Sequence, residues 1–189
     1  IMTDMEETNS IINKAAHDVL MLARNELMVN MRFLDTALSK LQLVPSDGLT
    51  LATNGSHLIY GPRHILRMFK VEQEKPAHDY LHVLLHCIYS HMFVGADIDR
   101  SLWDLACDVA VESILDDLHY RCLEETVSPL KMKTYGQCRA QMPVLTAEGI
   151  YRHLLKEDLP EYEVARLQRA FLQDDHGLWD MEKHEDQSQ

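Results

Sequence analysis

Residues 76–91 read PAHDYLHVLLHCIYSH, a proline followed by a run that is apolar except for four histidines, one aspartate and one serine. Proline is favoured at the first position of a helix, where its missing N–H is not needed. We therefore predict a helix from about residue 77 to residue 93 that ends before Gly95. Because apolar residues lie nearly all round it, this helix is expected at the centre of the fold.

Two histidines of this segment, His82 and His86, are four residues apart. At 3.6 residues per turn they lie about 40° apart on one helix face, one above the other. Such a pair is the helical half of many zinc sites, which need one or two further ligands. The alternative is a structural or surface pair. Two buried neutral imidazoles each need polar partners, however, and a shared cation would satisfy both.

The other two histidines are placed differently. His91 follows His86 by five residues, about 140° round the helix, so a helix that continues to Gly95 turns it away from the pair. His91 is a further candidate ligand, with a supporting or packing role favoured. His78 shares the face of the pair but lies in the first turn, and we do not expect it to be a ligand.

Acidic residues follow on the next predicted helix, which spans about residues 100–119. Asp108 and Glu112 share one face between apolar neighbours, and no lysine or arginine lies between positions 100 and 121. Buried carboxylates need a compensating charge, which a cation on the histidine pair would supply. Asp108 is therefore the predicted third ligand, with Glu112 a fourth ligand or a supporting residue. The alternative is a solvated acidic stripe formed by Asp104, Asp108, Glu112 and Asp116.

A third acidic run, Asp174-Asp175-His176, lies near the end of the chain. A histidine beside two carboxylates can reach a metal site as an extra ligand, or can orient another ligand. His176 is therefore a further candidate ligand. The alternative is a helix end that carries a histidine and solvated acids.

A β-hairpin is predicted around Asn54-Gly55, because a type I′ turn needs positive φ at both central residues. The predicted fold class is α+β, mostly helical, with a small hairpin or sheet on a helical core. We expect one domain over residues 8–176, with a motif-bearing core over 49–119 and a polar tail over 177–189. The other predicted elements are helices over 8–41 (one or two in tandem, begun at Asn9 or Ser10), 63–71, 146–157 and 160–172, an Asp99 cap for the helix over 100–119, and a loop over 128–143.

The 189 residues are 46% hydrophobic and carry a formal net charge of −12, from 18 basic and 30 acidic side chains. An acidic chain repels phosphate and anionic lipid, so nucleic acids and membrane surfaces are not expected partners. No apolar run reaches the roughly 20 residues that span a bilayer. The four cysteines have no C-x-x-C spacing, which favours free thiols and a cytoplasmic location.

Together, these segments resemble the zincin-like, metallopeptidase-like domain found N-terminal to VWA-like domains in bacterial proteins. That family reads H-E-x-x-H-x-x-x-x-H in the first helix and W-x-x-A-x-D-x-x-[IV]-[NE] in the second. The matching positions here are His82, His86, His91, Trp103, Ala106, Asp108, Val111 and Glu112. The resemblance covers residues 49–119. It implies a small sheet across the metal-site helix, a bound Zn²⁺, a C-terminal VWA-like domain, and protein partners such as MoxR-type AAA ATPases.

One position departs from that pattern. The family's glutamate, which takes a proton from metal-bound water, falls on Val83, and valine cannot act as a base. Such a base is worth about 10²- to 10⁴-fold in rate, so we predict a zinc-binding, metallopeptidase-like domain that lacks proteolysis. Two alternatives stay open: an active metal-dependent hydrolase with a non-standard base, for which Glu112 is the candidate, and a metal-free protein-interaction scaffold. A divalent first-row metal other than zinc also suits these residues.

Overall fold

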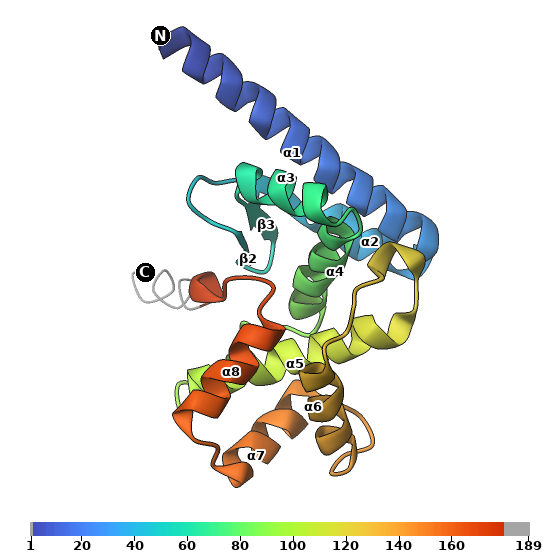
Figure 1. Ribbon diagram of the computed structural model, residues 1–189, viewed down its shortest axis with the longest axis vertical. Coiled ribbons are helices and arrows are strands. Elements are labelled where there is room, and N and C mark those ends of the chain that lie inside the picture. Colours follow the sequence, from blue (N-terminus) through green and yellow to red (C-terminus); the bar gives the residue numbers. More distant parts are fainter. Residues whose placement is uncertain (1, 180–189) are drawn as a thin grey trace, which may run out of the picture.

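The structure is a computed structural model that describes the backbone of residues 2–179 and the side chains of residues 4–179. It is mostly helical with one small sheet (Figure 1), which confirms the predicted α+β class. The helices are α1 (Met2–Asn30), α2 (Asp35–Lys40), α3 (Pro62–Val71), α4 (Lys75–Ile88), α5 (Arg100–Leu118), α6 (Pro129–Arg139), α7 (Ala147–Glu157) and α8 (Glu161–Phe171). The strands are β1 (Gln42–Pro45), β2 (Leu51–Thr53) and β3 (His57–Tyr60). Of the predicted tail, residues 180–189 lie outside the described part of the chain.

The predicted hairpin is present as β2 and β3, which pair antiparallel with Leu51 opposite Tyr60. Its turn differs from the predicted type I′, because Gly55 has a φ of 97° whereas Asn54 does not have a positive φ. Oδ1 of Asn54 instead accepts a hydrogen bond from the backbone N–H of His57 (2.9 Å). The side chain of Asn54 thus closes the turn in place of a second left-handed residue.

The N-terminal helical segment is two helices in tandem, α1 and α2, joined by a 3-10 turn at Arg32–Leu34. α1 already begins at Met2, so the predicted start at Asn9 or Ser10 is wrong, and its first turns extend beyond the body of the molecule (Figure 1). After α2 the chain enters β1, which pairs parallel with β3. The sequence does not reveal β1, because apolar residues with helical spacing continue into it.

The helix α4 ends at Ile88 rather than near residue 93. Ser90 has a φ of 56°, in the left-handed region that terminates many helices. The N–H of His91 then donates to the carbonyl of His86 (3.1 Å), so the chain turns back at this point. The expectation that His91 turns away from the histidine pair is therefore wrong. A serine suffices because one left-handed residue costs only about 1–2 kcal/mol.

The predicted loop over 128–143 is also wrong, because it contains α6. Oγ of Ser128 accepts a hydrogen bond from the N–H of Lys131 (3.2 Å), and Pro129 occupies the first helical position. By contrast, α5 begins as predicted, with Asp99 accepting a hydrogen bond from the N–H of Leu102 (3.2 Å). The helix α6 matters for the site because it supplies a buried lysine.

Buried apolar side chains form two clusters. One joins α1, α3, α4 and the sheet to Val111 and Leu115 of α5, and the other joins α5 to α8. The helices α4 and α5 contact each other (Figure 1). Histidines of α4 face acids of α5 across this contact, His82 beside Glu112 and His86 beside Asp108. All four cysteines are free, as predicted. In the described part of the chain, every helix is too short or too polar to cross a bilayer.

Candidate metal centre

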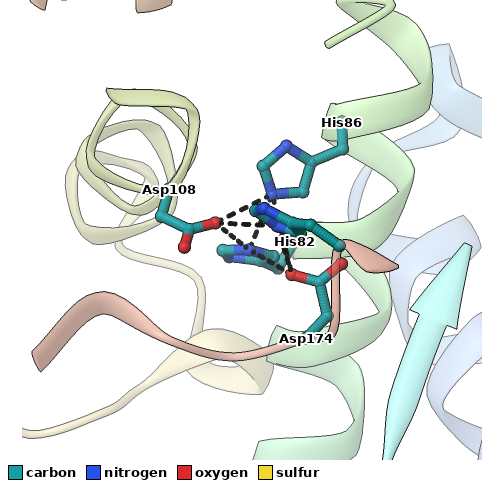
Figure 2. A group of neighbouring side chains, drawn as sticks. His82, His86, Asp108 and Asp174 are labelled. Carbon is teal, nitrogen blue, oxygen red and sulfur yellow. Dashed lines mark hydrogen bonds and ion pairs between the residues drawn. The ribbon is translucent and has the colours of Figure 1, made fainter. Parts of the chain in front are cut away.

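Five side chains from three segments converge between α4, α5 and the chain that follows α8. Each offers one nitrogen or oxygen atom, and these atoms all lie within 4.8 Å of one another. Four of the five side chains point toward a common centre in Figure 2, and His82 and His86 are fully buried. We call this group the His/Asp cluster; it consists of His82, His86, Asp108, Asp174 and His176.

The spacing within the cluster is that of ligands around one ion. Nε2 of His82 and Nε2 of His86 are 2.9 Å apart, and they lie 3.4 and 3.2 Å from Oδ1 of Asp108. Nε2 of His176 lies 3.2 Å from Oδ1 of Asp108 and 3.1 Å from Oδ1 of Asp174. Two atoms each about 2.1 Å from a metal are about 3.4 Å apart at a tetrahedral angle and about 3.0 Å apart at a right angle. A divalent ion therefore fits among these donors.

The ring nitrogens of the histidine pair show why a cation fits. Nδ1 of His82 lies 2.6 Å from Oε1 of Glu112, and because a carboxylate accepts, Nδ1 carries the proton. Nε2 of a neutral His82 then presents a lone pair to the cluster. Nδ1 of His86 lies 2.9 Å from Nδ1 of His91. When His86 donates there, its Nε2 also presents a lone pair, and two lone pairs 2.9 Å apart need a proton or a cation between them.

Glu112 lies outside the His/Asp cluster, behind His82. Oε1 accepts from His82, and Oε2 lies 2.6 Å from Nζ of Lys131. Burial opposes ionisation, but the hydrogen bond with His82 and the nearby positive charges outweigh it and hold the pKa of Glu112 below its usual value. This is the supporting role, since metal-bound histidines commonly donate their second N–H to a carboxylate. Both oxygens of Glu112 are thus engaged on the side of His82 that faces away from the cluster. Glu112 is therefore not placed to be a ligand of this cluster or a base that faces a substrate.

The other two histidines of the cluster also have neighbours at their second nitrogen. His91 is such a neighbour for His86, and burial lowers the pKa of His91 to about 3, so its ring is neutral. Nδ1 of His176 lies 3.5 Å from Oδ1 of Asp104, and the His176 ring stacks on Trp179 with a centroid distance of 3.6 Å. His91 is thus placed to orient His86 rather than to join the five donors.

The carboxylates of the cluster stabilise positive charge on its histidines. Burial lowers the pKa of His82, but hydrogen bonds with three carboxylates outweigh it and raise the pKa well above its usual value. Burial likewise opposes the charge on His176, yet Asp108 and Asp174 raise its pKa. Burial raises the pKa of Asp108, but the charge on His176 prevails and holds it well below its usual value. Metal ions and protons would therefore compete for the same nitrogens.

A short extended segment delivers Asp174 and His176. The N–H of Asp175 donates to the carbonyl of Leu51 (2.7 Å), and Asp175 forms a parallel bridge with Ala52 in β2. Because side chains alternate along an extended chain, Asp174 and His176 point to the same side. Asp174 is not among the predicted ligands. The only signal for it is its position two residues before His176.

The structure places the remaining candidates as follows. It brings His82, His86 and Asp108 together, with His176 beside them. His78 lies apart from the cluster, in a second group with Glu112 and Asp116. Lys131 already supplies a positive charge to that group. The sequence suggested that the acids of α5 need a metal for compensation; for Glu112 the compensating cation is instead this lysine.

Val83 and the nearest cavity complete the site. A cavity of about 830 Å³ reaches Asp108, Asp174 and His176, and Asp104 lies in its wall. Val83 is fully buried in the apolar cluster that joins α1, α3 and α4, and it is not among the described residues that line the cavity. Position 83 is therefore occupied by a core side chain that does not line this cavity.

A comparison with protein families covers all of these segments. A family model matches residues 16–188 of the chain, and its description is Putative metallopeptidase domain. No curated protein and no solved structure matches the chain. The match contains both histidine and acidic helices and the segment with Asp174 and His176. The chain therefore belongs to the Putative metallopeptidase domain family.

Proposed function

We propose that this domain binds one divalent first-row transition metal, with zinc the first choice, at the His/Asp cluster. The observation that supports this most directly is the pair of buried Nε2 atoms 2.9 Å apart, with carboxylate oxygens of Asp108 and Asp174 beside them. Three imidazoles and two carboxylates suit zinc, and they also suit other first-row ions that accept five or six ligands.

We further propose that this metal is held without zincin-type proteolysis. A bound ion would polarise a substrate oxygen and lower the pKa of water. Proton transfer from such a water needs a base that faces the substrate. Val83 has no titratable group and lies in the core, and Glu112 is engaged with His82 and Lys131 on the far side of the ring.

A second candidate is a metal-dependent hydrolase with a non-standard base. The cavity of about 830 Å³ beside the cluster favours it, because a substrate there would reach the metal. Asp104 is a carboxylate in the wall of that cavity, and it replaces Glu112 as the candidate base. The third possibility, a metal-free interaction scaffold, is decided by the metal test below.

The proposed protein partners come from the family resemblance, and the proposed location comes from the cysteines, whose spacing favours free thiols. The partners are a C-terminal VWA-like domain and a MoxR-type AAA ATPase, and the location is the cytoplasm. Nucleic acids and membranes are not proposed as partners. The net charge of −12 supports the exclusion of nucleic acid and anionic lipid.

Elemental analysis of the purified protein tests the proposal. We expect about one zinc per chain in the wild type, and loss of that zinc in His86→Ala. The matched control is His17→Ala, because His17 is an exposed histidine on α1. Equal metal content in wild type and His86→Ala would overturn the site. Casein or peptide cleavage by the zinc-loaded wild type, lost in Asp104→Asn, would instead favour the hydrolase.

A further inference from the structure

We propose that residues 172–179, here called the strap, carry two displaceable metal ligands. In this proposal Asp174 and His176 leave the metal when an extended peptide with a metal-binding oxygen takes their place. The inference rests on the proposed metal site and names what the site would accept.

The ligands of the cluster come from two kinds of structure. His82, His86 and Asp108 stand on α4 and α5, whose backbones are held by their own helical hydrogen bonds. Asp174 and His176 stand on the strap, which follows α8 and contains no α-helix or strand of its own. Helical ligands are fixed by cooperative backbone bonding, whereas an irregular segment opens at lower free-energy cost.

The strap has little backbone hydrogen bonding to the rest of the fold, and side-chain contacts hold most of it in place. One backbone hydrogen bond joins it to the sheet, from the N–H of Asp175 to the carbonyl of Leu51 (2.7 Å). The side chain of Gln173 contacts Lys75 and donates to Glu112 (3.3 Å). Trp179 is buried in the apolar cluster that joins α5 to α8, and its ring stacks on His176 and lies edge-on to His86 at a centroid distance of 5.0 Å. Between Gln173 and Trp179, one backbone hydrogen bond joins the strap to the sheet, so a metal bound by Asp174 and His176 would add a restraint there.

The number of ligands indicates why the strap would have to move. Two histidines and one carboxylate from helices make the three-ligand set of catalytic zinc sites, which keep a position open. All five donors would leave at most one position of an octahedral ion. If Asp174 and His176 left, two of the five donors and one negative charge would go with them. A bidentate anionic oxygen ligand matches both changes.

The strap also occupies a strand edge. The sheet order is β1-β3-β2, so β2 has a free side, and Asp175 bonds to Leu51 on that side. An extended peptide can bind a sheet edge through the same backbone hydrogen bonds. Thr50, Asp174 and Gly177 line the cavity of about 830 Å³, so the strap is one of its walls. A peptide that replaced the strap on Leu51 would lie beside the metal ligands.

Metal and acetohydroxamate binding test the proposal in the full chain. The variant Asp174→Ala/His176→Ala should still bind one zinc, more weakly than the wild type, because His82, His86 and Asp108 remain as a three-ligand set. Acetohydroxamate, a bidentate oxygen ligand, should bind the zinc-loaded variant at least tenfold more tightly than the zinc-loaded wild type. Asp175→Ala is the matched control, because this carboxylate is in the strap but outside the cluster.

The outcomes separate the strap from the metal site itself. No zinc in the wild type would overturn both proposals. Zinc in the wild type but complete loss in the double variant, as in His86→Ala, would make Asp174 and His176 obligatory ligands and overturn the strap alone. Equal acetohydroxamate affinity in the wild type and the double variant would do the same.

Hydrogen exchange gives a readout in the unmodified chain. Zinc should slow exchange in peptides covering residues 172–179 at least tenfold, and acetohydroxamate should reverse that protection while α4 and α5 stay protected. Asp175→Pro removes the N–H that bonds Leu51 and should raise acetohydroxamate affinity with all five donors intact. Strap protection that acetohydroxamate leaves unchanged would overturn the proposal.

Discussion

Oε2 of Glu112 lies 2.6 Å from Nζ of Lys131, and the side chains are 0% and 7% exposed. The other oxygen of the same carboxylate accepts from His82, so the lysine stabilises the charge that orients a ligand of the cluster. A residue from α6 thus supports the metal centre without touching it.

Lys131→Met should lower the free energy of unfolding by about 3–5 kcal/mol, because it leaves a buried carboxylate without its cation. Denaturant unfolding of the metal-free protein measures this change. The double variant Lys131→Met/Glu112→Gln should recover much of the loss, since it removes the unpaired charge. Equal stabilities of the single and double variants would contradict the ion pair's role.

Glu112→Gln should weaken zinc binding roughly 10- to 100-fold without abolishing it, as expected for a carboxylate behind a metal-bound histidine. Competition with a chelator measures the affinity. Asp117→Asn, an exposed acid on the same helix, is the control and should bind zinc like the wild type. Complete loss of zinc in Glu112→Gln would show that this carboxylate is itself a ligand.

The metal-free protein should lose stability as the pH rises above neutrality. The folded-state pKa values of His82 and His176 are raised above 6.5, so the stabilisation from their charged forms is present below that pH and is lost as the pH passes the raised values. Thermal melts between pH 6 and 9 measure the fall in Tm. Saturating zinc should remove it, because the metal replaces the protons. If the Tm of the metal-free protein did not fall over this range, His82 and His176 would not be stabilised in their charged forms by the neighbouring carboxylates.

Val83→Glu should destabilise the fold by about 3–5 kcal/mol and should not create peptidase activity, because residue 83 lies in the apolar core. Chemical unfolding and a fluorescent-peptide assay measure the two effects. Val83→Gln introduces a side chain of nearly the same shape as glutamate but without its charge, so it separates the effect of size from that of charge. Peptide cleavage gained in Val83→Glu would place position 83 in the active site after all.

Ser90→Val should cost about 1–2 kcal/mol, because a side chain at a φ of 56° meets the backbone and a β-branched one tolerates this poorly. It should also weaken zinc binding, since Ser90 brings His91 to His86. Ser90→Gly keeps the turn and should retain both stability and affinity. Thermal melts and zinc titrations check both variants, and an unchanged Ser90→Val would show that the turn is not required.

Local spacing was enough to predict several parts of the site. The helix α4, the cap of α5 by Asp99, the β2–β3 hairpin and the shared faces of His82 with His86 follow from interactions within a few residues. The periodicity of a helix fixes which side chains share a face, whatever the rest of the chain does. The sequence by itself therefore determined that His82 and His86 share one face of α4 and that Asp108 and Glu112 share one face of α5.

The tertiary structure decided what those neighbours meet. Glu112 contacts Lys131 from α6. Asp174 contacts His82 although the two residues are far apart in the sequence, and a hydrogen bond from Asp175 to Leu51 holds the segment of Asp174 in place. The contact of His91 with His86 depends on the left-handed backbone of Ser90, and the rest of the fold offsets the small free-energy cost of that conformation. Such contacts are set by how helices and strands pack, and no local spacing encodes which donors finally surround a metal.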